Sequence, residues 1–188
     1  YNLGIALKLM GRHDEAFAAF YKSVWNDACQ HASYLNLARI ACARGDYQEA
    51  CELIEQSLVK NYHSHSARHT KVAILRKAGR KEAAVAAIDE SLQLDPFNFG
   101  CLFERYLLDK EENDSKKTEA SLHKLLQVSR NWVHNFIEYA IDYADAGLYA
   151  EASALLHVHL DAGAQPYPMV YYYLGWFAQK QGLSDKAA

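Results

Sequence analysis

The chain has 188 residues, of which 51% are hydrophobic and 23% are charged, and its formal net charge at pH 7 is −3. This balance argues against a nucleic-acid-binding protein, which would normally carry a basic face. No run of about 18 consecutive apolar residues predicts a membrane span, and the first residues lack the basic-then-apolar pattern of a signal peptide. We therefore expect a cytoplasmic protein that binds neither nucleic acid nor membrane.

Glycine recurs at a fixed interval along the chain. Gly11, Gly45 and Gly79 are each 34 residues apart, and Gly147 follows Gly79 by 68 residues, or two intervals. Asparagine, which tolerates the left-handed conformation best after glycine, occupies the skipped position, and the last glycine falls one residue late. Since a tight turn between antiparallel helices needs a residue at positive φ, these positions predict one turn per unit. The predicted turn residues are Gly11, Gly45, Gly79, Asn113, Gly147 and Gly182.

The segments around these turns have the pattern of amphipathic helices. In the second unit we expect helices at 31–44 and 47–60, because apolar residues in the latter recur three and four positions apart. The alternation continues around 72–75 and 83–92, and Pro96 ends that unit because the residue before proline resists helical geometry.

The fourth unit departs from this pattern. Arg105 and Asp109 occupy positions that are apolar elsewhere, and the charged segment 110–117 lengthens the turn. Helices are expected again around 136–144 and 152–160, followed by a longer linker at 162–168.

An alanine stands five residues after most of the turns, in the first turn of the following helix. A larger side chain there would push the two helices apart, at a cost of about 1–3 kcal/mol. These alanines are Ala16, Ala50, Ala84, Ala152 and Ala187.

Together these features make the chain resemble the tetratricopeptide repeat (TPR) family, whose unit is a helix–turn–helix of 34 residues. The resemblance implies an all-α fold, a TPR-type α-α superhelix built as a solenoid of antiparallel helix pairs. We expect a single array of about five and a half repeats, truncated at both ends of the sequence. Its approximate units are 1–30, 31–64, 65–98, 99–132, 133–167 and 168–188. The segments 20–26 and 94–99 also resemble the repeat region of large bacterial proteins that have an uncharacterised, carbohydrate-related part.

The resemblance further implies a concave groove, lined by the first helix of each unit, in which a partner peptide docks. Counting along each first helix gives the inward positions, which include Ile137 and Ile141 in the fifth unit. The polar and aromatic ones suit a protein ligand: asparagine can bond a peptide backbone, arginine can bind a carboxylate through two hydrogen bonds, and tyrosine and tryptophan are enriched at binding hot spots. The expected partner-binding residues are Asn2, Asn36, Arg39, His69, Arg76, Tyr172, Tyr173 and Trp176.

Sites of other kinds are disfavoured. His65 and His69 are four residues apart, with His63 nearby, but a stable zinc site needs three or four ligands and none evidently completes this one. The four cysteines form no C-x-x-C pair and suit small apolar positions in the core. No phosphate loop, nucleophile elbow or zinc-protease motif is present. We therefore expect no catalytic residue, no cofactor and no metal.

The leading hypothesis is a non-catalytic module that binds a partner protein or peptide in the concave groove. The alternative is an assembly, spacer or dimerisation segment of a larger, carbohydrate-related bacterial enzyme, in which the repeats contact a neighbouring domain or a second copy.

Overall fold

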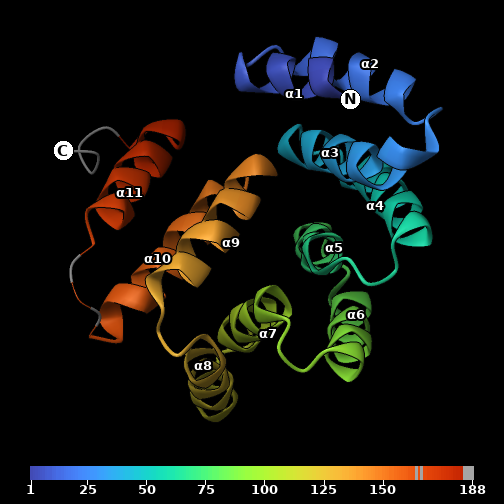
Figure 1. The fold of residues 1–188 in the computed structure, drawn as a ribbon. Coiled ribbons are helices and arrows are strands. Elements are labelled where there is room, and N and C mark those ends of the chain that lie inside the picture. The colour runs from blue at the N-terminus through green and yellow to red at the C-terminus, as the bar shows by residue number, and fades with distance from the viewer. Residues whose placement is uncertain (164, 166, 184–188) are drawn as a thin grey trace.

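The structure is a computed structural model that describes residues 1–163, 165 and 167–183. Within these residues the chain is a succession of α-helices joined by short turns (Figure 1). None of the described helices is both long and apolar enough to cross a lipid bilayer. In chain order the elements are α1 (Asn2–Leu9), α2 (His13–Ser23), the 3₁₀ turn η1 (Asp27–Cys29), α3 (Gln30–Ala43), α4 (Tyr47–Lys60), α5 (His65–Lys77), α6 (Lys81–Leu94), α7 (Phe99–Glu111), α8 (Ser115–Ser129), α9 (Val133–Asp145), α10 (Tyr149–Asp161) and α11 (Pro168–Lys180).

The helices form antiparallel pairs, and each pair is joined at one of the predicted turn residues. The helices expected at 31–44 and 47–60 are observed as α3 and α4. All six predicted turn residues have positive φ, between 56° at Asn113 and 80° at Gly45. Because the left-handed region is open to glycine and tolerated by asparagine, these residues end the first helix of each pair and let the chain reverse.

Small residues bring the two helices of a pair close together. Ala16, Ala50, Ala84 and Ala152 are completely buried, as a close helix crossing requires. The corresponding Ala187 lies outside the described residues. Large apolar side chains such as Phe20 and Ile54 fill the remaining space, and one hydrophobic core runs from α1 to α11.

The first four pairs curl into an arc in which α1, α3, α5 and α7 form the inner layer and α2, α4, α6 and α8 the outer layer (Figure 1). Successive pairs stack through close backbone contacts, such as those of α4 with α5 and of α6 with α7. This arrangement is the expected superhelix.

The fifth pair breaks the regular stacking. Arg130 and Asn131, between α8 and α9, are consecutive non-glycine residues in the left-handed region, with φ of 51° and 49°. After this bend α9 has no extensive backbone contact with α8, whereas it lies close to α3 and α5. In Figure 1, α9 lies on the inner side of the ring of helices, opposite α3 and α5, and α5 is seen nearly end-on. The concave side of the first three units is therefore covered by a helix of the same chain.

Candidate functional site

Arg39 lies at the centre of the inner surface and pairs with α9. Its guanidinium is 2.8 Å from a carboxylate oxygen of Asp142 and 3.5 Å from one of Asp145. Lys8 on α1 lies 2.8 Å from Asp145, and the hydroxyl of Ser66 on α5 donates to Asp142 at 2.7 Å. Two carboxylates, three positions apart on α9, are thus held by side chains from α1, α3 and α5.

The positive charge of Arg39 stabilises the ionised form of Asp142. Burial is the largest single influence and would raise the pKa of Asp142. The positive charge of Arg39, the influence of His69 and the hydrogen bonds from Ser66 and Arg39 together outweigh burial and leave the pKa below its ordinary value. Asp142 is therefore ionised at neutral pH. With only 6% of its surface exposed, Arg39 has little access to solvent and takes its carboxylates from within the chain.

Asn36 and His69, both expected to face a partner, also have internal neighbours. The amide of Asn36 accepts a hydrogen bond from Lys8 at 3.2 Å and donates one to the carbonyl of Ala32 at 2.8 Å. His69 is 1% exposed, and its ring packs against Tyr139 of α9 with centroids 5.1 Å apart. Burial lowers the pKa of His69 to about 4, so the imidazole is neutral at physiological pH.

Gly100 permits this close packing of α5, α7 and α9. A Cβ atom at Gly100 would lie 2.5 Å from the ring of His69 and 2.8 Å from that of Tyr139. The ring of His69 cannot move away freely, because it is only 1% exposed, whereas Tyr139 is partly exposed. The absence of a side chain at Gly100 is therefore required by the position of α9.

Arg76 is the centre of a second buried ionic cluster. Its guanidinium contacts Glu104 of α7 at 2.7 Å, Glu111 at 3.1 Å and Glu151 of α10 at 3.2 Å. Glu104 is completely buried and also accepts a hydrogen bond from the hydroxyl of Tyr143 at 2.8 Å. Because removing one partner of a buried ion pair leaves an uncompensated charge, this cluster locks α5, α7, α9 and α10 together.

The sequence-predicted site residues therefore fall into separate groups. Asn36, Arg39, His69 and Arg76 lie beneath α9 and α10, while Asn2 is exposed on α1. Tyr172 on α11 is 64% exposed, and Tyr173 and Trp176 are half-buried against Phe177. The aromatic residues of α11 do not join the cationic residues in one groove.

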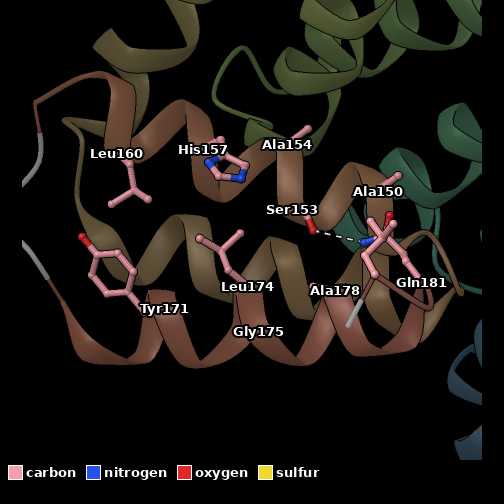
Figure 2. A pocket seen from close by; sticks show the side chains of 11 residues that line it. Ala150, Ser153, Ala154, His157, Leu160, Tyr171, Leu174, Gly175, Ala178 and Gln181 are labelled. Carbon is pink, nitrogen blue, oxygen red and sulfur yellow. Dashed lines mark hydrogen bonds between the residues drawn. The ribbon is translucent and has the colours of Figure 1, made fainter. Parts of the chain in front are cut away.

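An open groove lies between α10 and α11 (Figure 2). It has a volume of about 650 Å³, and its walls are mostly apolar, with the side chains of Leu160 and Leu174 pointing into it from α10 and α11. Ser153 and Gln181 form a hydrogen bond of 3.4 Å near one end. Exposed Tyr171 marks the other end, so this surface combines apolar walls with an aromatic rim.

The histidines near α5 are not gathered into one site. His69 is buried, whereas His65 is exposed and lies 3.3 Å from Asp95. Within the described part of the chain, no three histidine, cysteine, aspartate or glutamate side chains are grouped closely enough to hold a metal ion.

Sequence reasoning missed the residues of α9 and α10 that meet the inner surface: Asp142, Asp145, Tyr143 and Glu151. It named Ile137 and Ile141 as the inward positions of this helix and gave no role to the two aspartates. The available signal was the pair of carboxylates three residues apart, because the other residues from 139 to 145 are aromatic or apolar.

Comparison with known proteins agrees with this geometry. Two segments match family models described as tetratricopeptide repeat, one at residues 33–63 and the other at 65–98. No curated protein matches the sequence. Residues 33–63 and 65–98 thus match tetratricopeptide repeats, and the solved structures extend the likeness of fold to most of the chain.

Three solved structures illustrate the shared fold. PilW, a widely conserved type IV pilus biogenesis factor, has a TM-score of 0.62 and 17% identity, over 99% of this chain and 86% of PilW. TTC0263, a thermophilic TPR protein of Thermus thermophilus, has a TM-score of 0.61 and 19% identity over 97% of both chains. YrrB, a TPR protein with an unusual peptide-binding site, has a TM-score of 0.56 and 16% identity, over 90% of this chain and 86% of YrrB. The fold is therefore an α-α superhelical solenoid of the TPR type.

Proposed function

We propose that this chain is a non-catalytic protein-interaction module and that the inner faces of α1, α3 and α5 bind a segment of a partner protein. The observation that carries this proposal is the seating of α9. As its sequence advances, α9 crosses the inner helices in order: Tyr139 packs on α5 and α7, Asp142 on α3 and α5, and Asp145 on α1 and α3. A helix that lies across successive repeats occupies the place of a ligand in a solenoid groove.

The peptide-binding site named for YrrB is in keeping with this proposal, although it belongs to that protein. The chemistry of the inner surface points the same way. Its ionised groups are paired with opposite charges, and its histidine is buried and neutral, which suits recognition better than proton transfer.

Selection of peptide ligands tests this proposal. A displayed library of peptides about as long as α9 is selected on the immobilised chain, and each ligand is measured again on Arg39→Glu and on Lys22→Glu. Lys22 is exposed on the outer helix α2 and serves as a matched charge reversal away from the groove. We expect binding to be lost with Arg39→Glu and retained with Lys22→Glu. Ligands that bind both variants equally would refute groove binding. So would a library that yields no ligand either for the wild-type chain or for the variant Asp142→Asn with Asp145→Asn, in which α9 has lost the charges that pair with Lys8 and Arg39.

The groove between α10 and α11 supports a second candidate function, assembly with a second copy of the chain. Tyr171 and Tyr172 are 53% and 64% exposed beside apolar walls, and exposed apolar surface of this kind commonly marks an interface. We expect a concentration-dependent dimer in light scattering that Tyr171→Ser with Tyr172→Ser abolishes. A strictly monomeric chain would exclude this role. Membership of a larger carbohydrate-related enzyme remains a prediction from sequence.

A further inference from the structure

We infer that the inner surface of α1, α3 and α5 is a receptor for an acidic helix of a partner protein, and that α9 is an intramolecular occupant which this partner displaces. The inference rests on the proposed function and adds to it the chemistry of the partner and a means of regulation. Three independent features of the structure support it.

The first feature is the division of charge across the contact. The arc formed by the first four units contributes the cations Lys8, Arg39, Arg76 and Lys77, and α7 offsets these with Glu104 and Glu111. The opposing fifth unit contributes only anions to these pairs: Asp142, Asp145 and Glu151. Without the fifth unit the centre of the groove carries unpaired positive charge, so an occupant must bring carboxylates.

The second feature is the spacing of the two aspartates on α9 that contact the receptor. Asp142 and Asp145 are three residues apart, so both lie on one face of the helix and reach cations on neighbouring repeats. Two aromatic residues accompany them: Tyr139 and Tyr143 both pack on His69 of α5, with ring centroids 5.1 and 5.5 Å apart. The receptor therefore selects a helix with the pattern Tyr-x-x-Asp-Tyr-x-Asp.

The third feature is the connection of α9 to the preceding unit. Arg130 and Asn131 both have left-handed backbone conformations, which for residues other than glycine carry strain. α8 makes no extensive backbone contact with α9, so the fifth unit is connected to the preceding one mainly by this bend and is held in the groove by its side-chain contacts with α3, α5 and α7. Because α9 and α10 pack closely together, a rotation at these two residues would withdraw both helices, and the strength of those side-chain contacts sets its cost.

These features give α9 the role of a competitor within the chain. The effective concentration of a tethered segment is high, so an external helix binds weakly while α9 is seated. A partner with the same acidic face binds when α9 is released, and the affinity of the module is thereby set by the strength of the α9 contact.

The experiment uses the full chain and a labelled synthetic peptide of residues 133–146. In the variant Asp142→Asn with Asp145→Asn, the internal occupant loses its charges while the receptor is unchanged. We expect the peptide to bind this variant about tenfold or more tightly than the wild-type chain, as the loss of one desolvated ion pair implies. A control peptide carrying the same two substitutions should bind weakly to both chains, and adding Arg39→Glu to the variant should abolish binding.

A second measurement keeps the inference testable if that variant does not fold. Hydrogen exchange of the wild-type chain is followed at residues 133–145 with and without excess peptide. Faster exchange in α9 on addition of the peptide would support displacement. Unchanged protection of α9, or equal binding of the acidic and control peptides, would overturn the inference.

Light scattering of the variant identifies the occupant. A monomer that binds the peptide supports a partner helix, whereas dimerisation that the peptide cannot reverse would assign the groove to a second copy instead. The inference can fail while the proposed function stands. Library ligands that depend on Arg39 but carry no carboxylates would support the interaction module and refute the acidic partner.

Discussion

Gly147 offers the sharpest test of the contact between the fifth unit and the second. Gly147 and Gly45 both end a first helix in the left-handed conformation, with φ of 74° and 80°. An added Cβ at Gly45 would meet no atom within 4 Å, whereas at Gly147 it would lie 2.8 Å from both Cα and Cβ of Ala43. The two glycines thus share one backbone requirement, and only Gly147 has the additional contact across the groove.

Comparing Gly45→Ala with Gly147→Ala separates the cost of backbone strain from the cost of the added steric contact. Gly45→Ala should cost the left-handed strain alone, about 1–2 kcal/mol. Gly147→Ala should cost that amount and a further 1–3 kcal/mol or so, the usual range for overpacking against atoms that cannot move freely. For a chain of this length, each kcal/mol corresponds to a change of about 2–4 °C in Tm.

Thermal unfolding followed by far-ultraviolet circular dichroism provides the assay. We expect both variants to melt below the wild-type chain and Gly147→Ala to melt about 2–12 °C below Gly45→Ala. Equal melting temperatures for the two variants would refute the reasoning, because they would show that Gly147 in the fifth unit is not packed against Ala43 in the second.

Four further predictions concern the interior. Glu104→Ala should lower the free energy of unfolding by about 3–5 kcal/mol in urea titration, since it leaves Arg76 and the hydroxyl of Tyr143 without their buried partner. Burial lowers the pKa of His69 to about 4, so on acidification the unfolded chain binds this proton before the folded chain does. The free energy of unfolding should therefore fall by up to about 3 kcal/mol between about pH 6.5 and 4. His69→Gln should flatten this fall in urea titrations repeated across that pH range. Burial raises the pKa of Cys42 and Cys101 to about 12, so a thiol reagent at about pH 8 should leave both unmodified until urea is added. Ala50→Leu should cost about 1–3 kcal/mol in the same urea titration, because the site is fully buried at a helix crossing.

Much of the fold could be predicted because its signals are local. Positive φ at Gly45, alternation of apolar residues within 47–60 and the proline at 96 each act over a few residues of chain. Such features determine where helices begin and end whatever lies across the molecule. Even the turn at Asn113, where the series lacks a glycine, was predictable, because asparagine tolerates the same left-handed backbone conformation.

The candidate site was predicted less completely. Counting along the helices gave Arg39 and Arg76 the carboxylates of a partner as ligands, whereas in the structure both pair with carboxylates of the same chain. Counting within helices could not show this, because it repeats one stacking geometry from unit to unit. The bend at Arg130 and Asn131 interrupts that repetition, and Asp142 and Asp145 of α9 meet Arg39 and Lys8 of the inner helices.

The sequence by itself determined the period, the helix pairs and the turns, because hydrophobic spacing and backbone preference are properties of short segments. Only the tertiary structure decided that the inner groove is occupied, since occupation depends on side chains far apart in the chain, such as Lys8 and Asp145, meeting across the arc. The curvature that brings them together is the sum of small rotations between neighbouring units, and no single unit contains it.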